Sequence, residues 1–227
     1  AVTMLGVGGS HLGGLSERDA QETIEIALQG GVRFFDTARM YQSGGSETMM
    51  GKLLTPKYRD DIYLMSKTTA QNAEDARRDL EDSLRALNTD YLDLWQVHSV
   101  NSPNDVSDRI ANGVWSVMAE AKARHIGFTG HTQPAAHLQV LAESDIFDTC
   151  QMPVNLADPS YSSFIKQVMP QLIERKIGVI AMKSLANGGF FGGSAHGQSG
   201  NNPKIVPNLV SIAEAVHFAW SMPISVL

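Results

Sequence analysis

Four side chains that can move protons or hold charge follow apolar runs of the sequence, at the points where strands should end. Asp36 and Tyr41 follow one run, Lys67 follows the next and His98 follows the one after. Polar groups at strand ends are costly unless paired, so we expect these four to converge on one pocket. An ammonium beside a tyrosine stabilises the phenolate and lowers a pKa that is ordinarily about 10. With Asp36 holding Lys67 and His98 hydrogen-bonding a substrate oxygen, the set would be a proton donor aimed at a carbonyl.

The elements that must position these residues alternate between short apolar runs and longer segments of helical periodicity. Even spacing of the runs favours a single α/β domain over residues 1–227, a (β/α)8 TIM barrel. The eight strand centres are expected near Leu5, Phe35, Leu64, Leu94, Gly127, Met152, Val179 and Ser225. The helices are expected at residues 17–29, 46–54, 72–88, 106–123, 135–142, 164–175 and 208–220. Because the chain stops inside the last strand, we expect the last helix and the C-terminal loop of the barrel to be missing.

Composition narrows the class of protein. The chain has 227 residues, 43% hydrophobic and 19% charged, which is typical of a soluble globular domain. A net charge of −6 and scattered Lys and Arg argue against a nucleic-acid partner. No apolar run is long enough for a membrane helix, and no zinc-ligand spacing occurs, so we expect no membrane partner and no metal. The single Cys150 fits a reducing compartment and a cytoplasmic location; export by a signal since removed is the alternative.

Several runs of the sequence resemble the aldo-keto reductase family, in its bacterial type. The run FFDTARMY at 34–41, followed by GSE at 45–47, resembles the family signature. So do MSKT at 65–68, DYLDLWQVH at 90–98 and IGFTGH at 126–131. The resemblance covers essentially the whole chain in the family's order.

The resemblance implies an oxidoreductase that reduces a small aldehyde or ketone by hydride transfer from NADPH, or oxidises an alcohol in reverse. Tyr41 would be the general acid and Asp36, Lys67 and His98 its catalytic partners. NADH stays the alternative cofactor, and a homo-oligomer stays open. The residues that the resemblance assigns to the cofactor are Gly8, Gly9, Asp36, Thr129, Gln151, Lys183, Leu185 and Gly188.

Other interpretations stay open at this point. The fold could retain a nicotinamide cofactor as a sensor or regulatory subunit with little turnover, or could serve a lyase that uses the same lysine and histidine. The glycine run near the N-terminus suggests a dinucleotide fingerprint, but His11 stands where its last glycine should be. The glycine-rich segment 188–203 is predicted to be a long mobile loop, either a cofactor lid or a loop without that role.

Overall fold

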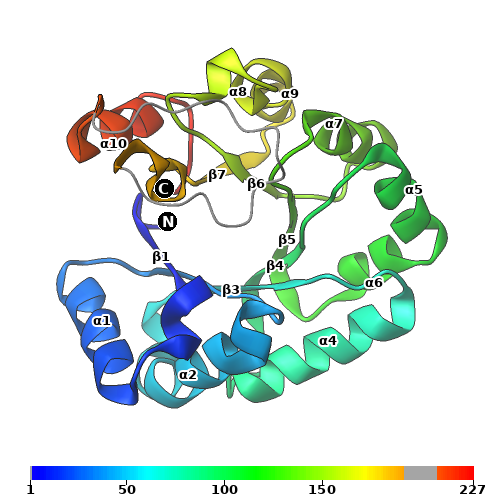
Figure 1. Ribbon diagram of the computed structural model, residues 1–227. Helices are drawn as coiled ribbons and strands as arrows, with labels where there is room; N and C mark the ends of the chain where they lie inside the picture. Colours follow the sequence, from blue (N-terminus) through cyan, green and yellow to red (C-terminus); the bar gives the residue numbers. More distant parts are fainter. Residues whose placement is uncertain (1, 192–208) are drawn as a thin grey trace. The chain divides into compact units, whose positions relative to one another are not determined.

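The computed structural model describes residues 2–191 and 209–227 (Figure 1). Its parallel sheet has seven strands in the order β1 to β7. The strands are β1 Gly6–Gly8, β2 Phe34–Asp36, β3 Tyr63–Thr68, β4 Leu92–Val97, β5 Ala123–Thr129, β6 Thr149–Pro153 and β7 Gly178–Met182. The α-helices are α1 Glu17–Gln29, α2 Gly45–Leu53, α3 Thr55–Tyr58, α4 Ala73–Ala86, α5 Pro103–Ala111, α6 Val114–Glu120, α7 Pro134–Glu143, α8 Phe164–Gln167, α9 Met169–Glu174 and α10 Ile212–Trp220. The 3-10 helices are η1 Gly9–Gly14, η2 Tyr41–Gly44, η3 Arg59–Asp61, η4 Asp158–Ser160 and η5 Ala186–Phe191.

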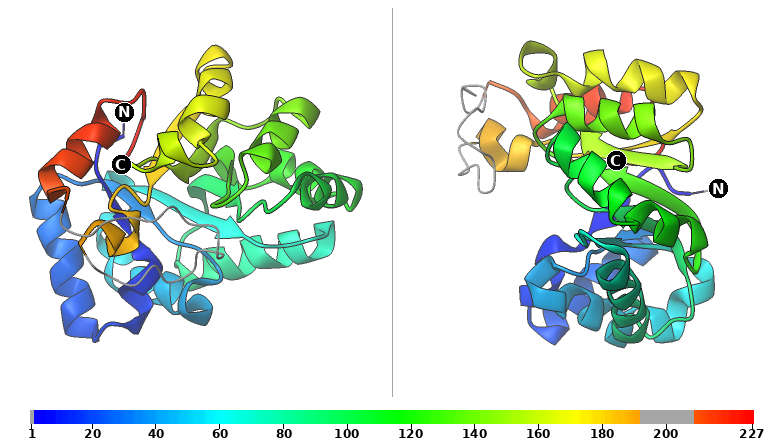
Figure 2. Two further views of the ribbon diagram at one scale, coloured as in Figure 1. Left: turned by 45° about the horizontal axis from the view of Figure 1, so that its top comes forward. Right: turned by 90° about the vertical axis from the view of Figure 1, so that its right-hand side faces the viewer.

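The chain divides into two compact units, Ala1–His98 with Ser107–Gly127 and Ser99–Val106 with Phe128–Leu227. In the first unit β1 pairs with β2, β2 with β3 and β3 with β4, all parallel. Helices α1, α2 and α4 lie together on one side of these strands (Figures 1 and 2). This order brings the carboxyl ends of β2, β3 and β4 to one edge, where a parallel α/β sheet builds its sites. A single barrel domain over residues 1–227 stays a prediction.

Local sequence signals explain the helices of the first unit. Ser16 caps α1 by accepting a hydrogen bond from the Asp19 amide at 3.2 Å, and Ala20, Ile24 and Leu28 are its buried face. Asn72 caps α4 in the same way. All six residues of β4 are buried, as expected for a parallel strand covered on both faces.

The second unit holds β6 and β7, paired in parallel from Thr149↔Gly178 to Pro153↔Met182. Beside them, Ala186 and Phe190 of η5 and Ala215 of α10 form a small apolar cluster. Rings also pack together: His137 lies edge-on to Phe164, with ring centroids 4.9 Å apart. This cluster packs α10 against η5 in the second unit.

Three predicted elements differ from the structure. The strand expected near Ser225 is only an isolated parallel bridge between Ile180 and Val226. The helix expected over 106–123 is two helices, because Gly113 adopts a left-handed φ of 81° between α5 and α6. The helix expected over 164–175 breaks at Val168, because Pro170 has no N–H to continue the hydrogen-bond ladder.

Two further expectations concern the loop and the end of the chain. Residues 188–191 belong to η5, while the rest of the predicted loop up to 203 lies outside the described residues. The expected absence of a last helix and C-terminal loop stays a prediction.

Candidate active site

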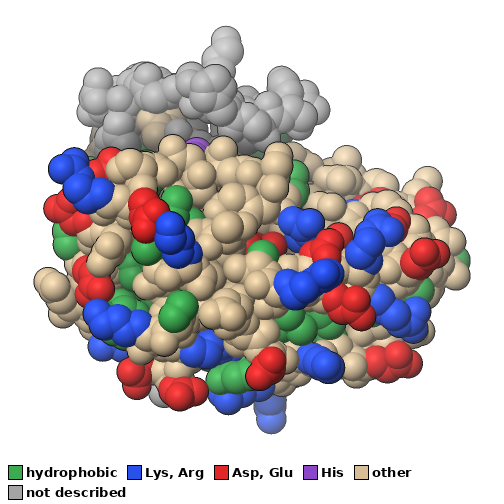
Figure 3. Space-filling model, turned by 90° about the horizontal axis from the view of Figure 1, so that it is seen from below, with side chains coloured by type: hydrophobic (Ala, Val, Ile, Leu, Met, Phe, Trp, Pro, Cys, Tyr) green, Lys and Arg blue, Asp and Glu red, His purple; other side chains and the backbone are tan. Residues whose placement is uncertain are grey.

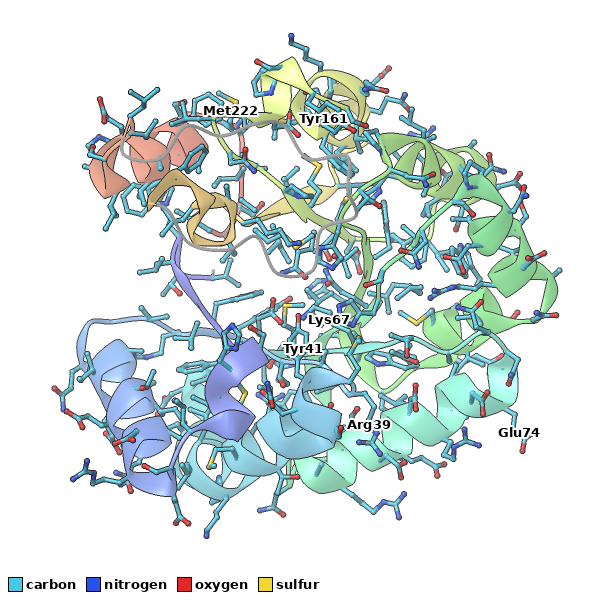
Figure 4. The ribbon with its side chains drawn as sticks, viewed as in Figure 1. Arg39, Tyr41, Lys67, Glu74, Tyr161 and Met222 are labelled. Carbon is cyan, nitrogen blue, oxygen red and sulfur yellow. The ribbon has the colours of Figure 1, made fainter. Side chains whose placement is uncertain are left out.

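Three residues of the predicted proton-transfer set lie at the ends of neighbouring strands in the first unit, and the fourth, Tyr41, lies in the segment that follows one of them. Asp36 ends β2, Lys67 is next to last in β3, and His98 follows β4 directly, its amide donating to Thr68 O at 2.7 Å. Tyr41 begins η2, five residues after β2. Figure 4 shows the side chains of Tyr41 and Lys67 pointing toward one another. The structure therefore brings these residues together, as the sequence predicted.

Lys67 is the buried centre of this arrangement, with 1% of the residue exposed. Its Nζ donates to Asp36 Oδ1, to the Thr37 carbonyl at 2.8 Å and to Tyr41 Oη at 3.2 Å. An ammonium has three N–H donors, so these three acceptors use all of them. Because Tyr41 Oη accepts from Lys67, its own hydrogen is left to donate elsewhere. The tyrosine is thus arranged as a hydrogen-bond donor.

Burial dominates the electrostatics of Tyr41. It raises the pKa of Tyr41, the charge and hydrogen bond of Lys67 lower it, and the charge of Asp36 raises it, leaving the pKa above its ordinary 10.0. As expected, Lys67 lowers the pKa of Tyr41. The net shift is nevertheless upward, because burial raises the pKa by more than Lys67 lowers it. Burial also lowers the pKa of Lys67, but Asp36 and Tyr41 outweigh it, so the pKa is raised and the ammonium stays charged. At neutral pH the pair is a neutral phenol beside a cation.

His98 is buried and lies against Tyr41, with ring centroids 5.6 Å apart and the planes at 83°. The guanidinium of Arg109, itself buried, donates to the His98 carbonyl at 3.2 Å. Sequence reasoning missed Arg109, which reads as an ordinary charged residue of a helix. Only its burial distinguishes it, and no sequence signal for that burial exists in the charge pattern alone.

Several residues that the resemblance assigned to a cofactor, namely Thr129, Gln151, Lys183, Leu185 and Gly188, belong to the second unit. Thr129 and Gln151 are buried. Within the described part of the chain, the Thr129 hydroxyl and the half-buried Lys183 ammonium have no hydrogen-bond or ion-pair partner. Burial lowers the pKa of Lys183. A buried hydroxyl without a partner is costly, so a polar ligand that bonds Thr129 would stabilise the second unit.

Of the two N-terminal glycines assigned to the cofactor, Gly8 and Gly9, only Gly8 lies beside open space in the described part of the chain. A Cβ on Gly8 would meet no atom within 4 Å among the residues described, which leaves room for a ligand. A Cβ on Gly9 would lie 2.6 Å from Met50 Cε and 2.7 Å from Asp36 O, so packing inside the protein already requires that glycine. Leu185 packs on the apolar cluster of η5 and α10. Gly188 adopts φ 82° in η5.

Surface charge on one face and the metal-binding side chains of the described residues bear on other kinds of site. On the face that carries α1, α2 and α4, cationic and anionic side chains are interspersed (Figure 3). Among the residues that the structure describes, no three His, Cys, Asp or Glu are grouped so that they could hold a metal ion. In the same part of the chain, every helix is too short or too polar to cross a membrane.

Known proteins resemble this chain along most of its length. The chain is 30% identical to aldo-keto reductase YhdN of Bacillus subtilis, over 80% of this chain and 56% of that protein. It is 28% identical to L-galactose dehydrogenase of Arabidopsis thaliana, over 82% of this chain and 63% of that one. The match thus spans less than two thirds of either relative.

A solved structure of an aldo/keto reductase also resembles this chain. The aldo/keto reductase of Klebsiella pneumoniae in complex with NADP and acetate is 25% identical, covers 86% of this chain and 70% of its own, and has a TM-score of 0.69. The family model of the aldo/keto reductases matches residues 4–222, which include Asp36, Tyr41, Lys67 and His98. The chain therefore belongs to the aldo/keto reductase family.

Proposed function

We propose that this protein reduces small aldehydes or ketones to alcohols with NADPH, with Tyr41 as the general acid. The observation that carries the proposal is the saturated Lys67 ammonium, which donates to Asp36, to the Thr37 carbonyl and to Tyr41. This arrangement leaves a neutral phenol whose hydrogen is free to donate, beside a fixed positive charge. A carbonyl that accepts a hydride needs such a donor for the charge that develops on its oxygen.

The second unit fits a nicotinamide cofactor. The unpartnered Thr129 hydroxyl would bind the carboxamide end together with Gln151, and the Lys183 ammonium would bind a phosphate. The Klebsiella relative is in complex with NADP, which supports NADPH over NADH as the first cofactor to test. In the first unit, the open space beside Gly8 also suits close approach of a ligand. When bound, the reduced cofactor supplies the hydride.

The chain's own residues would handle the proton. Tyr41 stays protonated at neutral pH, because burial raises its pKa, and it would give its proton to the oxygen of the reduced carbonyl. The tyrosinate left behind would be stabilised by the Lys67 ammonium 3.2 Å away until a proton from solvent replaces the one lost. His98, packed against the Tyr41 ring, would hydrogen-bond the same oxygen and orient the substrate.

The test is a comparison of wild type with Tyr41→Phe. NADPH oxidation would be followed by absorbance with a panel of small aldehydes and ketones, and L-galactose would be offered in the oxidation direction because of the Arabidopsis relative. We expect turnover by Tyr41→Phe to fall at least about a hundredfold, the contribution of general acid catalysis. Binding of NADPH, measured by calorimetry, should be unchanged.

Tyr58→Phe is the matched control, because the Tyr58 hydroxyl donates to Glu25 on the surface of the same unit. It should keep the wild-type rate. Equal rates for Tyr41→Phe and wild type would contradict the tyrosine mechanism, and NADPH binding without turnover of any compound would contradict the proposed activity.

A further inference from the structure

The segment 37–46, which carries Tyr41, is closed at its base by a hydrogen bond between two hydroxyl groups. Thr37 follows β2 directly and Ser46 lies in the first turn of α2. Their Oγ1 and Oγ atoms are 2.7 Å apart, and both residues are fully buried. A buried bond of this kind excludes competing water, so it holds the two ends of the segment at a fixed separation.

The direction of this hydrogen bond follows from a second contact. Ser46 Oγ also donates to the carbonyl of Gly9, 2.7 Å away. A serine hydroxyl has one hydrogen, so Ser46 cannot donate to Thr37 as well. Thr37 is therefore the donor in the bond between them, and a chain of donors runs from Thr37 through Ser46 to Gly9. This chain, named here the hydroxyl clasp, ties the ends of β1 and β2 to the start of α2.

The hydroxyl clasp connects directly to the catalytic set. The Thr37 carbonyl is one of the three acceptors of Lys67, which in turn donates to Tyr41. Between the ends of the clasp, Gln42 and Ser43 have φ of 51° and 53° and Gly44 has φ of 90°. Non-glycine residues in this left-handed region are strained and persist only where the surroundings hold them. The clasp is the buried polar contact at the base of that strained segment.

We propose that Thr37 and Ser46 are positioning residues, which hold Tyr41 and Lys67 in register for proton transfer. Neither side chain is one of the four catalytic residues, and both act through the segment they close and the carbonyl they fix. The proposal rests on the proposed function for its effect on turnover. Its effect on the ionisation of Tyr41 does not depend on any substrate.

The first experiment compares Thr37→Val, which keeps the shape and removes the hydroxyl, with Thr55→Val. Thr55 is another buried threonine of the same unit, and its hydroxyl donates to Leu87 O at 2.6 Å, away from Asp36, Tyr41, Lys67 and His98. The pKa of Tyr41 is read from the ultraviolet absorbance of tyrosinate, with Tyr41→Phe subtracted as the blank. We expect Thr37→Val to raise that pKa, because the ammonium that lowers it is no longer held at the phenol oxygen. Thr55→Val should leave it unchanged.

Turnover gives the second readout. Thr37→Val should lower kcat roughly ten- to a hundredfold, the effect of a small misplacement of reacting groups, with the dissociation constant of NADPH unchanged. Thr37→Ser restores a hydroxyl and should restore both the pKa and kcat. Ser46→Ala removes the same bond from the other side and keeps the proposal testable if Thr37→Val does not fold.

An unchanged or lower Tyr41 pKa in both Thr37→Val and Ser46→Ala would overturn the proposal, as would an equal change in Thr55→Val. If wild type reduces no carbonyl compound, the proposed function fails, while the tyrosinate titration still decides the hydroxyl clasp.

Discussion

At the scale of single residues, the chemistry of the site depends on a balance between burial and one positive charge. Burial keeps Tyr41 protonated, and Lys67 limits the cost of the phenolate that forms when the proton leaves. Asp36 serves the tyrosine only through Lys67, since its own charge raises the tyrosine pKa. The three groups thus work as a unit, and removal of one changes the environment of the others.

Replacement of Lys67 by methionine tests this balance. Burial of Tyr41 remains in this variant, while the Lys67 charge that lowers the tyrosine pKa is lost. The pKa of Tyr41 should therefore rise further above 10.0. Reduction needs the protonated phenol, which exists below that pKa, so the alkaline limit of activity should move to higher pH. At neutral pH, kcat should fall about a hundredfold or more, because the tyrosinate is no longer stabilised. The pH profile of kcat is the measurement.

Lys52→Met is the control for Lys67→Met, because Lys52 forms an exposed pair with Glu17. An alkaline limit that does not move in Lys67→Met would contradict the balance between burial and the Lys67 charge.

The stability of the fold should also depend on alkaline pH, because the pKa values of Tyr41 and Lys67 are both raised on folding. Their contribution is therefore present below their ordinary values of 10.0 and 10.5 and is lost as pH rises through the folded values.

At the scale of elements, α2 packs between β3 on one side and α4 on the other. Its first turn carries Ser46 of the hydroxyl clasp, and Glu47 accepts a hydrogen bond from Ser66 of β3 at 2.5 Å. Burial raises the pKa of Glu47, which is fully enclosed there. On its other side α2 approaches the end of α4 so closely that a Cβ on Gly51 would lie 1.9 Å from Ala86 O.

Gly51→Ala should therefore destabilise the protein by about 1–3 kcal/mol, the usual cost of overpacking a core. Urea denaturation followed by circular dichroism measures this as a lower midpoint. Gly30→Ala is the matched control, because φ at Gly30 is −71° and its Cβ would meet carbonyl oxygens only at 3.4 Å. If both variants unfolded at the wild-type midpoint, the close approach of α2 to α4 would be wrong.

Sequence patterns predicted most elements and failed where single residues interrupt them. Capping by Ser16 and the buried stripe of α1 agree with the structure. The continuous helix over 106–123 was wrong, because periodicity continues across Gly113 although the backbone does not. Hydrophobic spacing reports which face is buried and carries no record of a break in the backbone that preserves that face.

At the scale of the whole molecule, the proposed cofactor should stabilise the folded chain. A ligand present at about 100 times its dissociation constant raises the free energy of unfolding by about 2.7 kcal/mol. We expect NADPH to raise Tm, and Lys183→Met to weaken NADPH binding about tenfold or more through loss of a charge-assisted hydrogen bond. Differential scanning fluorimetry over an NADPH titration gives both quantities.

Lys176→Met is the control for Lys183→Met, because Lys176 is an exposed lysine of the same unit. It should show the wild-type shift in Tm. The role assigned to Lys183 would be wrong if Lys183→Met kept the full stabilisation by NADPH.

The sequence by itself determined the strand-and-helix alternation, the family and the four residues that meet at the strand ends. These follow from patterns that are local in the chain: hydrophobic spacing, and motifs that place one polar residue after each strand. Only the tertiary structure decided the direction in which the Tyr41 pKa is shifted, the hydrogen bond from Lys67 to the Thr37 carbonyl, and the hydroxyl clasp. Burial and hydrogen-bond direction depend on atoms brought together from distant parts of the chain, and a local pattern contains no measure of either.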